Sequence, residues 1–203
     1  ASVLPPSQLS RYRAVVCAFT PIPGRSDVES GLLGSLCVHA RCLVLLSSRT
    51  VCGPGLGMTE ECRVLPKPSE PLSYAATKAA QEQMFVRILK QANTRVLILR
   101  LPNVIGYDRT GFSGTFTNIM GRSIISKRRI QLAFGPCVVK DFLGLRDLGH
   151  GIDRLLAAGE SGVFNLSYGF GVTVGDFVER LLEGLSALGF TGVEVYYGSA
   201  PES

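Results

Sequence analysis

The sequence predicts an α/β fold in which a mostly parallel sheet carries helices on both faces. Short apolar runs at 14–19, 42–46, 95–101 and 163–166 have the length and composition of buried parallel strands. Helical segments separate successive runs, as a parallel sheet requires, because its strands are joined by crossovers. The 203-residue chain is 46% hydrophobic and 18% charged, so it has enough apolar surface for a sizeable core.

Several helices are predicted between and after these strands. The strongest covers 75–92, which is rich in good helix formers and repeats apolar residues at helical spacing, so one face should pack on the sheet. Further elements are expected as helices over 116–125, 147–158 and 173–188 and as a strand over 129–134. Thr173 and Asp176, three residues later, have the spacing of a helix cap.

Tyr74 and Lys78 are the most informative pair of residues in the chain. They lie four residues apart at the start of the strongest predicted helix, and positions i and i+4 share one helix face. A phenol near a fixed cation loses its proton more easily, so Tyr74 is a candidate general acid or base. Alone, such a pair is usually a surface feature. Ser47 and Ser48 strengthen it, because they follow a predicted strand where α/β folds place ligands.

Motifs in order along the chain resemble the extended short-chain dehydrogenase/reductase family, which includes nucleotide-sugar epimerases and dehydratases. Residues 47–53 are similar to its Ser-Ser-x-x-Val-Tyr-Gly, with Cys52 replacing the tyrosine, and Tyr74 and Lys78 match its Tyr-x-x-x-Lys. Residues 100–106 are similar to its Arg-x-x-Asn-x-Tyr-Gly. Two later segments, 140–148 and 162–166, resemble its Arg-Asp-Phe-x-x-Val-x-Asp-Leu and Gly-Val-Tyr-Asn-Ile motifs.

This resemblance implies catalysis with NAD or NADP. Tyr74 would exchange a proton with a substrate hydroxyl, Ser48 would hydrogen-bond the same oxygen, and Lys78 would lower the pKa of Tyr74 and hold the nicotinamide ribose. The implied cofactor-binding residues are Thr20, Ser47, Tyr74, Lys78 and Pro102, and the implied substrate-binding residues are Ser48, Asn103 and Lys140. Lys140 stands where the family has arginine, and lysine cannot reproduce a bidentate grip on phosphate.

The family's opening unit, a strand, a Gly-x-x-Gly-x-x-Gly turn and a helix, does not precede Ser47. Residues 13–20 instead resemble its fourth strand, so the N-terminal strands are expected to be missing. Residues 1–106 would form a partial Rossmann-like dinucleotide-binding domain. Residues 107–203 would form a small substrate lobe with elements that return to the main sheet. The glycine clusters at 53–57 and 169–175 are interpreted as structural.

Three functional hypotheses follow. The first is an NAD(P)-dependent epimerase, dehydratase or reductase acting on a small molecule such as a nucleotide sugar. The second is a non-catalytic relative that serves as a scaffold or subunit. The third is an enzyme whose other half is supplied by a separate chain. An incomplete parallel sheet exposes an edge, so we expect a homo-oligomer or a partner chain that completes the sheet.

Composition narrows the remaining classes of function. The net charge of +5 is modest and no nucleic-acid motif accompanies it, so no nucleic-acid partner is expected. Two isolated histidines and six scattered cysteines do not have metal-site spacing. The cysteines are interpreted as reduced, small apolar residues of a reducing compartment.

No apolar run is long enough to span a membrane. A cytoplasmic location is therefore expected. The stretch from Ala1 to Ser26 contains arginines and serines without an acidic residue, which leaves an organelle transit segment as an alternative.

Overall fold

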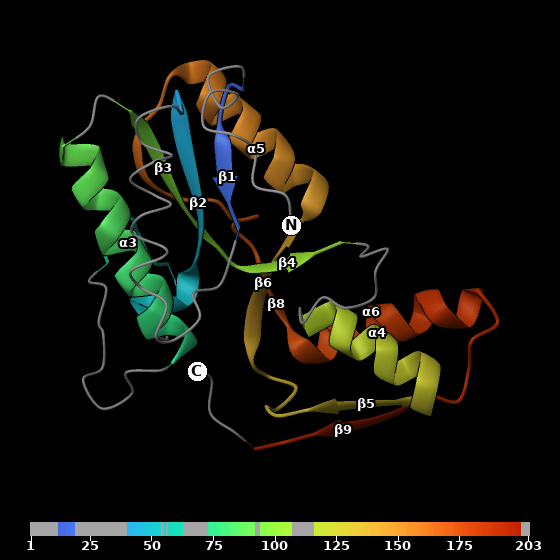
Figure 1. Ribbon diagram of the computed structural model, residues 1–203. Coiled ribbons are helices and arrows are strands. Elements are labelled where there is room, and N and C mark those ends of the chain that lie inside the picture. The colour runs from blue at the N-terminus through green and yellow to red at the C-terminus, as the bar shows by residue number, and fades with distance from the viewer. Residues whose placement is uncertain are drawn as a thin grey trace. The chain divides into compact units, whose positions relative to one another are not determined.

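The computed structural model of the chain describes residues 12–18, 40–53, 55, 57–62, 73–91, 94–106 and 116–199 (Figure 1). The chain divides into two compact units. The first contains the chain up to Leu101 together with His150–Leu166, and the second contains Pro102–Gly149 and Ser167–Ser203. The first unit therefore includes one late helix segment and one late strand, both from the range 107–203.

The first unit is built on one parallel sheet. Its strands are β1 (Val15–Cys17), β2 (Cys42–Ser48), β3 (Arg95–Leu101) and β7 (Gly162–Asn165), in the order β1-β2-β3-β7. All neighbouring strands are parallel, and β2 and β3 pair from Cys42 opposite Arg95 to Ser48 opposite Leu101. The predicted mostly parallel α/β fold is confirmed, and the four strands lie at the four predicted apolar runs.

The two central strands are apolar along nearly their whole length because both of their faces are covered. The sheet and α3 (Tyr74–Gln91) share a core in which Phe85 is fully buried against residues such as Leu43, Leu45 and Ile98. Figure 1 shows α3 on one side of this sheet and the later part of α5 (Leu145–Ala158) on the other. Helices therefore cover both faces, as the sequence predicts.

The described residues of the second unit form two small sheets, two helices and the first residues of α5. One sheet has the order β4 (Asn103–Ile105), β6 (Val139–Gly144), β8 (Gly171–Thr173), with β4–β6 parallel and β6–β8 antiparallel. The other pairs β5 (Arg129–Leu132) with β9 (Glu194–Tyr197) in parallel. The helices are α4 (Phe116–Lys127) and α6 (Val174–Ala187). Of these strands, the sequence predicted only β5.

The second unit has a core of its own. Met120 and Ile124 from α4 pack with Ile130 of β5 and Val178 of α6. The cap predicted for the last helix is present, because the Thr173 hydroxyl oxygen accepts a 3.0 Å hydrogen bond from the Asp176 backbone N–H. In the part of the chain that the structure describes, no helix is both long and apolar enough to cross a membrane.

Candidate active site

Ser48 ends β2 and caps the short 3-10 helix η1 (Arg49–Cys52). Its backbone is extended, and its hydroxyl oxygen accepts hydrogen bonds from the Thr50 backbone N–H at 3.3 Å and the Thr50 hydroxyl at 3.0 Å. Serine suits a helix cap because its short side chain reaches the unpaired N–H groups of the first turn. The cap therefore fixes the direction in which the Ser48 hydroxyl points.

Tyr74 and Lys78 occupy the first turns of α3, as predicted. The Ser73 hydroxyl accepts a 3.1 Å hydrogen bond from the Ala76 N–H and so starts the helix one residue before Tyr74. Lys78 is buried, and its Nζ donates a 2.9 Å hydrogen bond to the carbonyl of Leu46 in β2. The same Nζ lies 5.9 Å from the centre of the Tyr74 ring. Helix α3 thus brings both side chains to the end of β2 that carries Ser48.

The electrostatics of Tyr74 differ from the sequence-based expectation. Partial burial raises the pKa of Tyr74, and a hydrogen bond with the Ser48 side chain lowers it by less. The expected lowering by Lys78 is not among the causes of the shift, and burial lowers the pKa of Lys78 itself. Because desolvation disfavours the phenolate, Tyr74 keeps its proton at neutral pH. Its side chain is still 51% exposed and open to a substrate.

A buried polar network lies directly behind these residues. Ser47 donates a 2.5 Å hydrogen bond to one carboxylate oxygen of Glu82, and Arg100 forms a 2.8 Å ion pair with the other. All three side chains are buried. A buried ion pair is tolerated only when both charges are well hydrogen-bonded. The network therefore fixes α3, which carries Glu82, against the ends of β2 and β3.

This network was not predicted, although the sequence contains two signals for it. Glu82 follows Lys78 by four residues and so lies on the same, inward face of the helix. Arg100 interrupts a strand that is otherwise apolar. A charge at a buried position needs a partner, and these two charges have opposite signs. Ser47, expected at the cofactor, has its hydroxyl committed to Glu82.

The expectation that all cysteines are reduced is wrong for one pair. Cys52 and Cys62 form a disulfide, which closes a loop directly after η1. The two residues are only ten positions apart, and the turn after η1 brings their Cα atoms within 5.6 Å. Cys17 and Cys42 are buried and Cys137 is exposed, and none of the three is in a disulfide, as expected, whereas Cys37 lies outside the described residues.

The remaining predicted site residues are in the second unit or outside the described chain. Pro102 joins β3 to β4, and Asn103 in β4 donates a 3.2 Å hydrogen bond from its side-chain amide to the Asp141 carbonyl of β6. The Lys140 Nζ lies 4.8 Å from the centre of the Phe134 ring. Thr20 lies outside the described residues. Among the described residues, no three His, Cys, Asp or Glu side chains gather as metal ligands.

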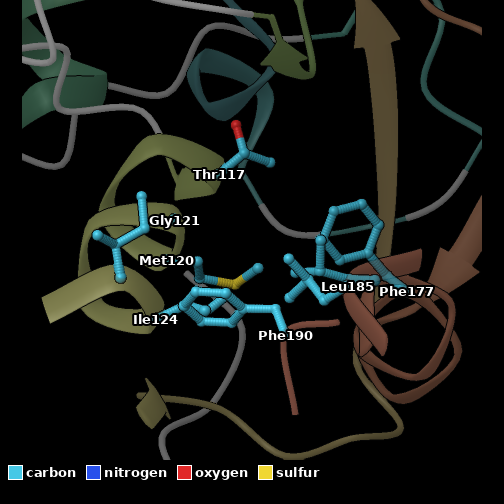
Figure 2. A pocket seen from close by; sticks show the side chains of 9 residues that line it. Thr117, Met120, Gly121, Ile124, Phe177, Leu185 and Phe190 are labelled. Carbon is cyan, nitrogen blue, oxygen red and sulfur yellow. The ribbon is translucent and has the colours of Figure 1, made fainter. Parts of the chain in front are cut away.

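The second unit also contains an apolar cavity of about 210 Å³ (Figure 2). Helices α4 and α6 supply most of its wall, and Phe190 completes it. It is lined by Thr117, Met120, Gly121, Ile124, Ile125, Phe177, Leu181, Leu185 and Phe190. Thr117 carries the one hydroxyl among these side chains, and none of them is a base that could activate it, so this lining does not form a catalytic centre.

The parallel sheet of the first unit agrees with the comparisons with known proteins. The chain belongs to the NAD dependent epimerase/dehydratase family, whose model matches residues 32–167. This match confirms the family resemblance of the sequence motifs. Comparison with curated protein sequences finds no match.

Solved structures confirm the Rossmann-like fold. UDP-N-acetylglucosamine 4-epimerase from Methanobrevibacter ruminantium superimposes with a TM-score of 0.73 and 19% identity, over 94% of this chain and 65% of that one. dTDP-glucose 4,6-dehydratase from Bacillus anthracis in complex with NAD superimposes with a TM-score of 0.71 and 21% identity, over 95% of this chain and 62% of that one. RMD from Pseudomonas aeruginosa complexed with NADPH superimposes with a TM-score of 0.69 and 21% identity, over 98% of this chain and 74% of that one. The chain therefore spans about two thirds of the length of the first two.

Proposed function

We propose that this chain carries the proton-transfer residues of an NAD(P)-dependent epimerase, dehydratase or reductase that acts on a hydroxylated substrate such as a nucleotide sugar. One observation carries the proposal: the Lys78 Nζ, hydrogen-bonded to the Leu46 carbonyl, lies 5.9 Å from the centre of the Tyr74 ring at the end of β2 that carries Ser48. Family membership supports this chemistry, as do the NAD and NADPH complexes of similar solved structures.

The described residues fit a nicotinamide cofactor at this edge of the sheet. The carboxyl ends of parallel strands are where open α/β sheets bind nucleotides, and Ser48 stands at such an end. Lys78, Tyr74 and Pro102 would hold the cofactor, with Thr20 as a further contact. Because the Ser47 hydroxyl is committed to Glu82, Ser47 would contribute through its backbone. The bound nicotinamide would exchange a hydride with the substrate carbon.

Each of the three central residues has a separate role in proton transfer. Tyr74 holds a proton on its phenol oxygen at neutral pH and would donate it to a carbonyl oxygen, or accept one back from a hydroxyl after losing it. Ser48, whose side chain lowers the pKa of Tyr74, would orient the same substrate oxygen. Lys78, held by the Leu46 carbonyl, supplies positive charge where the phenolate forms.

The second unit would contribute the substrate contacts. Asn103 uses one amide N–H for the Asp141 carbonyl, which leaves its side-chain oxygen and second N–H for a ligand. Lys140 would attract a phosphate as a point charge, with less directional control than arginine.

The sheet also suggests a partner. Among the described strands, β1 lies at one edge of the sheet and pairs only with β2. We propose that further strands complete this edge, from a second copy of the chain or from a partner chain, because an open strand edge favours pairing.

Titration of the chain with NAD and with NADP by calorimetry tests the proposal. Binding should be weakened by Lys78→Ala and unchanged by Lys90→Ala, which removes an exposed lysine from the same helix. Tyr74→Phe should retain binding and lose turnover. A folded chain that binds neither nucleotide contradicts the proposal and favours a scaffold role. Binding that appears only after a partner chain is added would instead support a split enzyme.

A further inference from the structure

The Cys52–Cys62 disulfide closes a loop at the edge of the sheet that carries the candidate active site. Cys52 is the last residue of η1, the short helix that Ser48 caps. Between the two cysteines, the loop is tied to β7 by two hydrogen bonds with Asn165. The Asn165 backbone N–H donates to the Glu60 carboxylate at 2.8 Å, and the Asn165 side-chain amide donates to the Met58 carbonyl at 2.9 Å.

Arg100 links this loop to the buried network. Its Nη1 donates to the Glu60 carbonyl at 3.0 Å and lies 3.1 Å from the Cys62 sulfur and 3.6 Å from the Cys52 sulfur. Its Nη2 pairs with Glu82, which in turn accepts the Ser47 hydroxyl. A continuous series of contacts therefore joins the disulfide to the residue before Ser48 and to the helix that carries Tyr74 and Lys78.

Two properties make this disulfide exchangeable rather than inert. Both cysteines are only half-buried, so a thiol can approach them. The guanidinium of Arg100 stands closer to the Cys62 sulfur, and a positive charge stabilises a thiolate as it leaves. Cys52 is therefore the sulfur that an incoming thiolate would attack, with Cys62 as the leaving group.

We propose that Cys52 and Cys62 form a reversible redox pair that controls the order of the loop and, through it, cofactor binding. A thiolate of a dithiol reductant attacks Cys52, the Cys52–Cys62 bond breaks, and the electron pair goes to the Cys62 sulfur. The second thiol of the reductant then releases Cys52. Two electrons and two protons pass to the protein, and the reductant becomes a disulfide.

Reduction frees the two sulfurs to separate while Arg100 stays paired with Glu82. The loop gains conformational freedom because the crosslink that limited it is gone. Helix η1 begins after its cap, Ser48, and ends at Cys52. The added freedom of the loop therefore reaches the Ser48 cap. The oxidised pair is the ordered, binding-competent state, and the effect on binding rests on the proposed function. If the protein resides in a reducing compartment, a disulfide there is expected to be regulatory rather than structural.

The first experiment uses the unmodified protein. It is equilibrated at graded ratios of reduced to oxidised dithiothreitol, trapped by alkylation and mapped by mass spectrometry. Cys52 and Cys62 should become alkylated together at one midpoint in the folded protein, whereas Cys137, the exposed free thiol, should be alkylated at every ratio. Alkylation of Cys52 and Cys62 under fully oxidising conditions would overturn the proposal. So would a disulfide that reacts only after unfolding.

The second experiment measures amide hydrogen exchange and nucleotide affinity in both redox states. Reduction should lower protection of residues 57–62 and weaken NAD or NADP binding about tenfold. The Cys52→Ser/Cys62→Ser double variant should behave as reduced in both buffers, and Cys137→Ser should respond like the unmodified protein. Equal protection and affinity in both states would overturn the proposal. Absence of nucleotide binding in both states counts against the proposed function instead, and hydrogen exchange still decides the redox control of the loop.

Discussion

At the scale of single residues, the proposed function gives the Tyr74 phenol the choice of which direction of proton transfer is favoured at neutral pH. Partial burial places its pKa above the ordinary value, and the Ser48 hydrogen bond offsets only part of that shift. The neutral phenol is the form that donates a proton to a carbonyl oxygen. Oxidation of a hydroxyl requires the phenolate, which is scarce until the pH approaches the raised pKa.

The pH dependence of the two directions should therefore be opposite. Carbonyl reduction should stay constant through neutral pH and fall as the pH rises past the pKa of Tyr74, whereas alcohol oxidation should rise over that range. Tyr74→Phe should lower kcat in both directions by about 10²-fold or more, the usual contribution of a general acid or base. Steady-state rates from pH 6 to 11 would measure this, with Tyr168→Phe as an exposed control in the second unit. Reduction that speeds up with rising pH would contradict the assignment.

The Glu82–Arg100 pair gives a second prediction about individual residues. Arg100→Met leaves the Glu82 carboxylate buried without its 2.8 Å partner, which should cost about 3–5 kcal/mol of unfolding free energy. The Glu82→Met/Arg100→Met double variant should lose less than either single variant, because no buried charge is left unpaired. Urea unfolding of the three variants gives the coupling energy. Additive losses would show that the two charges do not depend on each other.

At the scale of elements, the strands and helices have different relations to their sequences. Strand β3 has the bounds of its predicted run, because a strand buried on both faces is mostly apolar, and its one buried charge, Arg100, is paired with Glu82. Strands β4, β6, β8 and β9 were not predicted. Their residues are mostly half-buried or exposed, and their partners are distant in sequence, so no local apolar pattern marks them.

Helical glycines provide a prediction about the elements. In α4, a Cβ added at Gly121 would meet nothing within 4 Å. Gly121→Ala should therefore stabilise the protein by about 0.5–1 kcal/mol through helix propensity alone. In α5, a Cβ at Gly151 would meet Leu166 Cδ1 at 2.7 Å, so Gly151→Ala should gain less or lose stability. Thermal unfolding of both variants distinguishes the cases, and equal shifts would contradict this packing.

At the scale of the whole molecule, the chain has two units, each with a core of its own. The first unit contains the Ser48, Tyr74 and Lys78 group together with the network that supports it. The second contains Asn103, Lys140 and the apolar cavity.

Separate cores predict separate responses to a cavity. Ile98 and Ile130 are both fully buried, one in each core. Ile98→Ala and Ile130→Ala should each cost about 2–5 kcal/mol, and the loss should concentrate in the unit that contains the substitution. Hydrogen exchange read by mass spectrometry would assign each loss to its unit. Identical loss of protection in both units for both variants would show that the cores unfold as one.

The sequence by itself determined the parallel sheet and helix α3. It also determined that Ser48 ends a strand and that Tyr74 and Lys78 begin the helix. Each depends on local pattern: a buried strand shows as an apolar run, and a Tyr–Lys pair at helical spacing shares a face wherever its helix packs. Only the tertiary structure decided that Glu82 meets Arg100, that Cys52 bonds Cys62, and that burial raises the pKa of Tyr74. These features depend on side chains that folding brings together and desolvates, and sequence spacing records neither distance nor burial.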